Sequence, residues 1–195
     1  MRKVIVSEFV SLDGVMEDPG WTFQFHSEEQ EKYKFDELAA SDALLLGRRT
    51  YVEFAAAWPT MMDQYEGPRR AELSEFADMM NSYPKHVVSR SLQEPLGWSN
   101  STLVKGNVAD AVSNLKQQPG QDILIFGSAE LVNALMRHDL IDEYRLMVFP
   151  VVVGKGKLLF GDGIDKKVLE LVGTEMFVSG VVVLTYRPAG RETEG

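Results

Sequence analysis

The feature that most constrains the fold of this chain is an apolar strand that ends in a glycine and runs directly into a helix. Residues 123–126 are an apolar run that predicts a buried strand. Beyond Gly127, apolar residues recur every three or four positions over residues 131–136, which is typical of a helix. Gly127 can adopt backbone angles closed to other residues, and Ser128 is a good helix cap. The unpaired N–H groups at such a helix start suit an anion, with an ordinary strand-to-helix turn as the alternative.

Two further predicted strands also end in residues that suit the binding of an anion. Residues 42–47 predict a strand that ends in glycine and runs into a helix beginning with Arg48 and Arg49, although a helix start disfavours positive charge. Residues 85–88 predict a short strand followed by Ser89–Arg90. Ligands of parallel sheets bind beyond the carboxyl ends of the strands. If these strands lie side by side, the helix starts and arginines converge at one edge and form a pocket for a phosphorylated nucleotide.

The order of the predicted elements favours a single α/β domain. Strands and helices alternate as far as residue 136, whereas residues 144–187 predict strands alone. Over residues 1–188 we therefore expect a mostly parallel central mixed β-sheet, an antiparallel C-terminal edge hairpin and flanking helices. A polar tail is expected at residues 189–195. Besides the elements above, the sequence predicts strands at 3–10, 102–104, 168–178 and 181–187, helices from 27, over 71–81 and over 107–116, and an exposed loop at 60–70.

The composition excludes several classes of protein. The 195 residues include no cysteine, which excludes disulfides, thiolate chemistry and cysteine-based zinc sites. The formal net charge is −9 without a long basic run, so we expect no nucleic-acid partner. No apolar run reaches the roughly 18 residues that predict a membrane span, and the first strand lacks the marks of a signal peptide. We therefore expect a cytoplasmic protein, and the scattered His26, His86 and His138 predict no metal site.

The ordered motifs of the chain resemble the dihydrofolate reductase superfamily. The closer resemblance is to its branch that contains the C-terminal reductase domain of the bifunctional riboflavin-biosynthesis deaminase/reductase. The order and spacing of the motifs fit this branch over roughly residues 3–187. The segments that carry the resemblance are Ser11-Leu-Asp-Gly14, Ala43-Leu-Leu-Leu-Gly-Arg-Arg-Thr-Tyr51, Val87-Val-Ser-Arg90, Ile125-Phe-Gly-Ser-Ala-Glu-Leu131, Asp142-Glu-Tyr-Arg-Leu146 and Pro150-Val-Val-Val-Gly-Lys-Gly-Lys-Leu-Leu-Phe160.

The resemblance implies an NADPH-dependent reductase with a dihydrofolate reductase-like fold, often a homodimer. It assigns Gly47, Arg48 and Thr50 to the cofactor phosphates, and Ser89 and Arg90 to the adenosine 2′-phosphate. The segment that matches the pyrophosphate loop comprises Gly127, Ser128, Ala129, Glu130 and Leu131. This agrees with the interpretation from the residues themselves, in which helix-start amides and guanidinium groups bind phosphate.

For the substrate, the resemblance points to the first loop. It implies that Asp13 orients the substrate or relays a proton, and a loop turn made with the following glycine is the alternative. Trp21, Phe23 and Phe25 are candidates for stacking on a planar heterocycle, and core or lid packing is their alternative. The other residues expected at the substrate are Ser11, Pro150 and Gly154.

Two departures from the family pattern bear on function. Gly127–Ser128 stands where many relatives have two glycines. The folate enzymes carry a carboxylate in their first helix, and the nearby candidates without a fixed match are Glu28, Glu29, Glu31 and Asp36.

The expected activity is hydride transfer from NADPH to a small heterocyclic or carbonyl substrate. The named candidate is the pyrimidine reduction of riboflavin biosynthesis, and a pterin or a carbonyl compound is the competitor. No deaminase activity is expected, because the chain lacks that half of the bifunctional enzyme. The alternative is a non-catalytic NADP(H)-binding module that acts as a sensor or scaffold.

Overall fold

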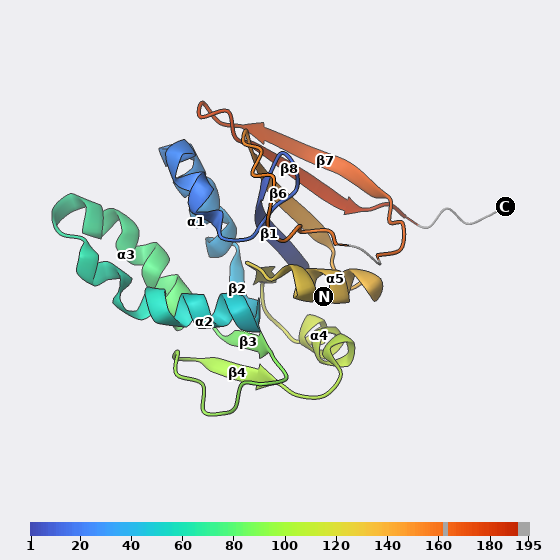
Figure 1. The fold of residues 1–195 in the computed structure, drawn as a ribbon. Coiled ribbons are helices and arrows are strands. Elements are labelled where there is room, and N and C mark those ends of the chain that lie inside the picture. The colour runs from blue at the N-terminus through green and yellow to red at the C-terminus, as the bar shows by residue number, and fades with distance from the viewer. Residues whose placement is uncertain (162–163, 191–195) are drawn as a thin grey trace.

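The computed structural model describes residues 1–161 and 164–190, which form one mixed β-sheet with helices on both faces (Figure 1). The strand order in these residues is β4-β3-β2-β5-β1-β6-β8-β7. Neighbours from β4 to β6 pair in parallel, and β8 pairs antiparallel with β6 and β7. This confirms the expected parallel body with an antiparallel C-terminal hairpin at its edge. The strands are β1 (Val4–Ser11), β2 (Ser41–Gly47), β3 (Lys85–Val88), β4 (Ser101–Val104), β5 (Asp122–Ile125), β6 (Glu143–Phe149), β7 (Leu169–Met176) and β8 (Val182–Pro188).

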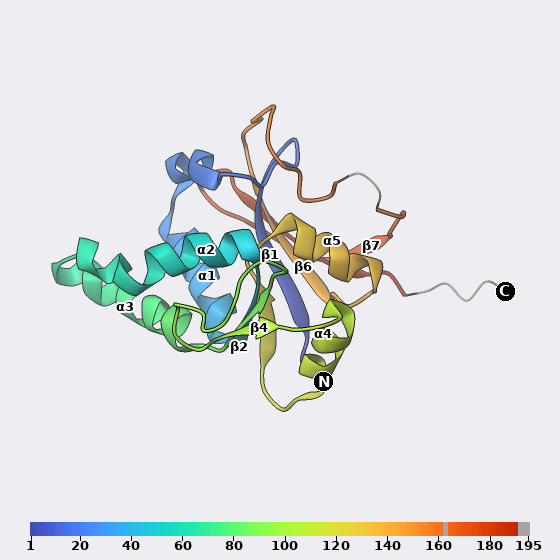
Figure 2. The same cartoon turned by 60° about the horizontal axis from the view of Figure 1, so that its bottom comes forward.

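The central strands are apolar throughout because both of their faces are covered. Along β5, Ile123 and Ile125 pack in one core cluster with α4 and α5, whereas Leu124 packs in a second cluster with α1, α2 and α3. Figure 2 shows these two groups of helices on opposite sides of the sheet. The helices are α1 (Glu28–Ala39), α2 (Arg48–Ala57), α3 (Gly67–Ser82), α4 (Val108–Gln117) and α5 (Ala129–Arg137), with 3₁₀ helices η1 (Pro19–Phe25) and η2 (Trp58–Gln64).

One predicted element is wrong in the region between α2 and α3. Residues 60–70 were expected to form an exposed loop, but they consist mainly of η2 and the first turn of α3. Pro59 and Pro68 occupy the first positions of these two helices, where proline costs no hydrogen bond. The prolines therefore mark helix starts here, not only the break after α2.

Within the described residues, no helix combines the length and apolar character that a membrane crossing requires. Residues 191–195 of the expected polar tail lie outside the described residues, and Pro188 closes β8.

Candidate active site

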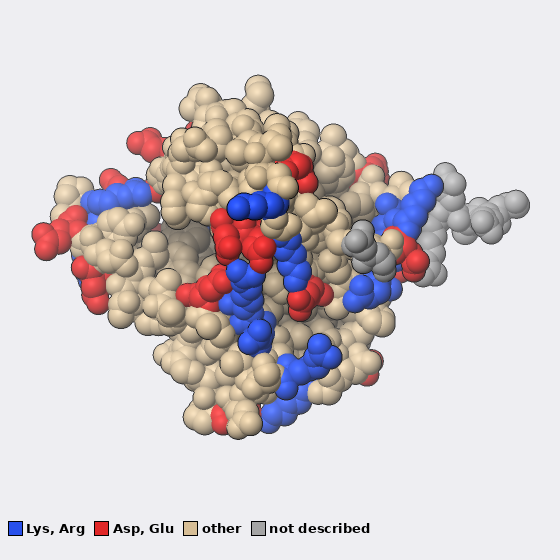
Figure 3. All heavy atoms as spheres, in the orientation of Figure 1, with Lys and Arg blue, Asp and Glu red and all other residues tan. Residues whose placement is uncertain are grey.

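A large open cleft lies at the carboxyl ends of β1, β2, β3 and β5. Its volume is about 2080 Å³, well above the roughly 300–1000 Å³ typical of a pocket for one small molecule. Figure 3 shows this face of the molecule hollowed between α1 and α2, with acidic and basic side chains gathered beside the hollow. The cleft therefore has room for two ligands side by side.

At one end of the cleft, the starts of α2 and α5 pack directly against each other. The Gly47 N–H donates to the Gly127 carbonyl at 3.3 Å. A Cβ at Gly47 would overlap the Ser128 hydroxyl, and a Cβ at Gly127 would lie 2.5 Å from Thr50 Oγ1. Gly127 also has a φ of +91°, which side chains disfavour. The two glycines are thus required by close approach, and the predicted meeting of these turns is confirmed.

Neither helix start is closed by a side chain. Ser128 occupies the N-cap position of α5 as expected, but its hydroxyl accepts no capping hydrogen bond. Gly47, the N-cap of α2, has no side chain to offer. The first N–H groups of both helices therefore lack a side-chain acceptor and remain available to an anion.

Two arginines converge on the same point from different strands. Arg48 begins α2 and Arg90 follows β3, and both line the cleft without a salt bridge among the described residues. Their charges, after the hydrogen bond and charge of Lys157, help to lower the pKa of Glu130 at the start of α5. Ser89 accepts hydrogen bonds from the N–H groups of Ser91 and Leu92 and so shapes the turn that carries Arg90. We call this region the arginine end.

Arg49 behaves differently from its neighbour. It forms ion pairs with Glu17, with Asp18 at 2.8 Å and with Glu53 at 3.1 Å. Its guanidinium group therefore ties the loop after β1 to the first turns of α2. Of the two arginines that begin this helix, Arg48 alone keeps its charge without a carboxylate partner among the described residues.

The residues expected at the substrate from the resemblance lie outside the lining of the cleft. Asp13 accepts hydrogen bonds from Ser11 Oγ at 2.6 Å, from Val153 N at 3.1 Å and from Gly154 N at 2.7 Å. These bonds lower the pKa of Asp13 to about 2 and join two loops that are distant in sequence. Pro150, at the end of β6, also lies outside the cleft lining. The geometry suits the turn alternative for Asp13, and the substrate roles of these residues stay predictions.

The aromatic residues of η1 divide between core and surface. Trp21 and Phe25 pack on Phe149 with ring centroids 5.5 and 6.0 Å apart. Phe23 is 80 % exposed and is the member of this stretch that lines the cleft. Trp21 and Phe25 thus pack as their alternative expects, and their role in stacking on a substrate stays a prediction.

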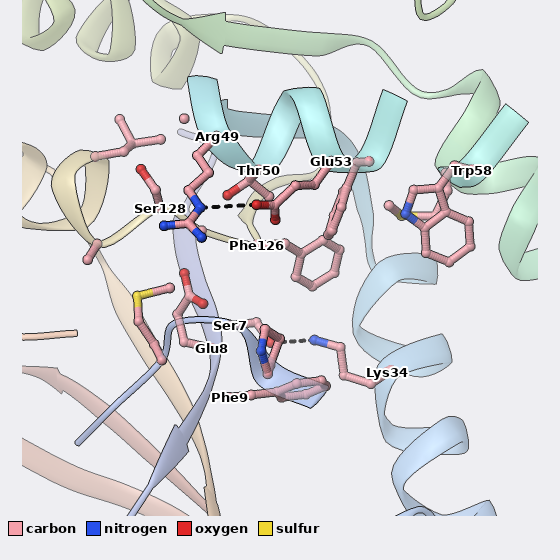
Figure 4. A pocket seen from close by; sticks show the side chains of 18 of the residues that line it. Ser7, Glu8, Phe9, Lys34, Arg49, Thr50, Glu53, Trp58, Phe126 and Ser128 are labelled. Atoms are coloured by element: carbon pink, nitrogen blue, oxygen red, sulfur yellow. Dashed lines mark hydrogen bonds and ion pairs between the residues drawn. The ribbon is translucent and has the colours of Figure 1, made fainter. Parts of the chain in front are cut away.

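The other end of the cleft has aromatic walls and a polar floor. Its floor is β1, where Ser7, Glu8 and Phe9 line the cavity, and its sides are α1, the second half of α2, and α3. Figure 4 shows the Glu8 side chain pointing from β1 into the cavity and Lys34 reaching in from α1. We call this region the aromatic end; its aromatic side chains are Phe9, Phe35, Phe54, Trp58, Phe76 and Phe126.

Lys34 is held in place by a network behind this floor. Its ammonium group donates to Ser7 Oγ at 2.7 Å and pairs with Glu37, and Ser7 Oγ donates to Glu37 Oε2 at 2.7 Å. The Lys34 ammonium group also lies 4.1 Å from the centre of the Phe126 ring. These contacts satisfy the charge of Lys34 within the protein.

Glu8 is the residue at this site that sequence reasoning missed. It is 6 % exposed, and its Oε1 has no hydrogen-bond partner among the residues that the structure describes. Burial raises the pKa of Glu8 to about 8, although Lys34 and the Gly127 N–H act in the opposite direction. The signal was a glutamate inside a strand whose other residues are mostly apolar. None of the first-helix candidates is comparable, because Glu28, Glu29, Glu31 and Asp36 are not buried.

The protein is thus a single α/β domain with an open cleft at the carboxyl ends of its strands, and one end of the cleft suits an anion and the other a planar apolar group. The chain belongs to the RibD C-terminal domain family, whose model matches residues 2–183. It is 31 % identical over 185 residues to the uncharacterised Bacillus subtilis (strain 168) protein YyaP, covering 95 % of this chain and 94 % of YyaP.

Many solved structures share the fold, and two of them illustrate it. One is a candidate riboflavin biosynthesis protein from Shewanella sp. PV-4, with a TM-score of 0.73 and 24 % identity over 96 % of this chain and 99 % of that one. The other is dihydrofolate reductase from Enterococcus faecalis complexed with NADP(H), with a TM-score of 0.60 and 15 % identity over 96 % and 97 % of the two chains. The dihydrofolate reductase-like fold expected from the sequence is thereby confirmed.

Proposed function

We propose that this protein is an NADPH-dependent reductase that acts on a C=N or C=O bond of a small heterocyclic or carbonyl compound. The observation that carries the proposal is the arginine end, where two uncapped helix starts converge beside the aromatic end with Arg48 and Arg90, which have no salt-bridge partner in the described part of the chain. Family membership supports the reductase class, and the pyrimidine reduction of riboflavin biosynthesis is the candidate that the family suggests.

The residues at the arginine end fit a dinucleotide with an additional phosphate. The uncapped amides at the start of α5 would hold the pyrophosphate, with Gly127 allowing close backbone approach. Arg48 and Thr50 would hold phosphate oxygens, and Ser89 and Arg90 the adenosine 2′-phosphate. When bound, this cofactor supplies a hydride to the neighbouring substrate.

The protein's own contribution to this chemistry is placement and the exclusion of water. Direct hydride transfer requires two carbons in near contact within a dry pocket and a source of a proton. The aromatic end lies beside the arginine end in one continuous cleft, so a planar substrate there would face the cofactor. Its aromatic rings would exclude water from the faces of a bound planar substrate, and charged side chains of α1 and α3 line the rest of the cavity.

Calorimetric titration with NADPH and NADH tests the cofactor assignment. We expect the wild-type protein to prefer NADPH, and Arg90→Ala to weaken NADPH binding by about 1.5–3 kcal/mol more than NADH binding, because a charge-assisted bond is lost. Arg70→Ala is the control, since Arg70 bonds to carbonyls of η2 and the following residue, outside the cleft lining. Equal losses for both cofactors would remove Arg90 from the 2′-phosphate site.

The competing hypothesis of a non-catalytic module makes a different prediction. A sensor or scaffold would bind NADPH without oxidising it in the presence of pyrimidine, pterin and carbonyl compounds. Oxidation of NADPH with any one of these classes favours the enzyme. The homodimer implied by the family resemblance is a separate expectation, which sedimentation analysis would test.

A further inference from the structure

The Glu8 carboxyl is buried in the cleft with fewer hydrogen bonds to the described residues than a structural carboxyl normally makes. It lies on β1, at the middle of the sheet, and lines the boundary between the arginine end and the aromatic end. The Gly127 N–H at the start of the α5 turn lies close enough to affect its carboxyl group. Its Oε1 is buried and has no hydrogen-bond partner within residues 1–161 and 164–190. An unpaired buried oxygen is costly unless a ligand completes its hydrogen bonding.

The charged side chains around the aromatic end restrict the charge that its ligand can carry. Among the described residues that line this end, each basic side chain already has a carboxylate partner. Lys34 pairs with Glu37, Lys32 pairs with Asp36 at 2.6 Å, and Arg69 pairs with Glu31 and Glu72. His26 contacts Glu31 at 2.5 Å, and Arg49, at the boundary, pairs with Glu17, Asp18 and Glu53. No cation is left there for a phosphate, and the surplus of carboxylates repels one.

The contrast with the arginine end is sharp. There, Arg48 and Arg90 have no salt-bridge partner among the described residues, as an anion site requires. The cleft therefore separates a region for phosphate from a region for an uncharged group. The aromatic rings of the second region offer flat apolar surfaces, with Trp58 and Phe76 centroids 5.5 Å apart.

We propose that the aromatic end binds a planar heterocycle that carries no phosphate, and that Glu8 hydrogen-bonds this heterocycle and donates the proton in its reduction. This rests on the proposed reductase function. It also narrows that function, because it selects an unphosphorylated heterocycle over a phosphoribosyl compound as the substrate.

The reaction step balances with a reduced nicotinamide as the co-reactant. The carbon of the C=N bond accepts the hydride while the Glu8 O–H bond breaks and its proton forms an N–H bond on the neighbouring nitrogen. The substrate is reduced to an amine, the nicotinamide is oxidised, and the Glu8 carboxylate regains a proton from water. For a C=O substrate, the proton goes to oxygen and the product is an alcohol.

The protonation state of Glu8 is consistent with this role. Burial and, to a smaller extent, Glu37 raise the pKa of Glu8, whereas Lys34 and the Gly127 N–H lower it, and the resulting pKa is about 8. The group is therefore protonated near pH 7. A general acid is most effective when its pKa lies close to the working pH.

Two matched pairs of probes test the substrate class: a ribosylaminouracil and its 5′-phosphate, and a dihydropterin with and without a phosphate on its side chain. Calorimetry on the NADP⁺ complex measures the binding of each probe independently of turnover. We expect the unphosphorylated member of at least one pair to bind at least about 10-fold more tightly. Preference for the phosphorylated member, or binding of neither pair, would overturn the assignment of the aromatic end.

Glu8→Gln tests the proton donor, with Glu75→Gln on the exposed face of α3 as the control. We expect Glu8→Gln to leave NADPH affinity unchanged, to weaken the heterocycle and to reduce turnover by about 10²–10⁴-fold. Carbon-13 NMR of the labelled carboxyl should show a group that titrates near pH 8 and is absent from the variant. Unchanged turnover in Glu8→Gln would refute the role of Glu8. If wild-type protein fails to bind NADPH, the proposed function itself fails.

Discussion

Replacing Glu8 with glutamine should change how the stability of the protein depends on pH. Burial raises the pKa of this carboxyl from an ordinary 4.5 to about 8 in the folded protein. Between these two values the folded state keeps a proton that the unfolded state has released, so the free energy of unfolding falls as pH rises. Below pH 4.5 both states are protonated, so the contribution of Glu8 to stability is fully present there and no longer changes with pH.

The magnitude is large enough to measure. At about 1.36 kcal/mol per pH unit, this single group removes about 2–3 kcal/mol of stability between pH 5 and pH 7. The whole free energy of unfolding of a domain is typically about 5–15 kcal/mol. Glutamine has nearly the same shape and does not titrate, so the variant should gain in stability relative to wild type by this amount as pH rises.

Urea unfolding at pH 5, 6, 7 and 8 provides the assay, and the quantity of interest is the difference between variant and wild type. Other titrating groups contribute equally to both proteins and cancel in this difference. Glu75→Gln should show a constant difference over the same range. If the difference between Glu8→Gln and wild type is equally flat, Glu8 is ionised in the folded protein and the argument from its burial fails.

Other residues lead to separate outcomes. Asp13→Asn should abolish the stability that wild type loses between about pH 4 and pH 2, since hydrogen bonds lower the pKa of Asp13 in the folded state; acid unfolding curves measure this, and turnover tests its predicted catalytic role with NADPH affinity retained. Gly127→Ala should lose NADPH affinity and stability, because the added Cβ would meet Thr50 Oγ1 at 2.5 Å at a φ of +91°; calorimetry and thermal melts of the same variant check both. Leu124→Ala should cost about 2–5 kcal/mol in urea unfolding through the cavity left in a fully buried site, and a loss below 1 kcal/mol would contradict its place in the core.

The sheet and the convergence of its turns could be predicted from local signals. Apolar runs such as residues 43–46 and 123–126 identify buried strands without knowledge of their partners. The glycines and arginines that follow them mark the carboxyl ends, and parallel strands bring those ends together. This reasoning locates Gly47, Arg48, Arg90 and Gly127 correctly at one edge.

The floor of the cleft could not be predicted in the same way. The Glu8 carboxyl is buried because β1 lies between β5 and β6, which follow it in the chain by more than 100 residues. The Asp13 carboxylate likewise accepts hydrogen bonds from the Val153 and Gly154 amides, and no local sequence pattern predicts those bonds. The contacts of side chains whose partners are this distant in sequence depend on the topology of the sheet. Sequence reasoning therefore assigned no role to Glu8, and the role expected for Asp13 came from the family resemblance alone.

The interlocked starts of α2 and α5 have a kinetic consequence. Gly47, Thr50, Gly127 and Ser128 fill each other's space so closely that neither turn can shift without displacing the other. The amides that we propose bind phosphate are therefore rigid before any ligand arrives, and little ordering entropy would be lost when one binds. Association at this end should proceed in one step, with an observed rate that rises linearly with ligand concentration and shows no plateau.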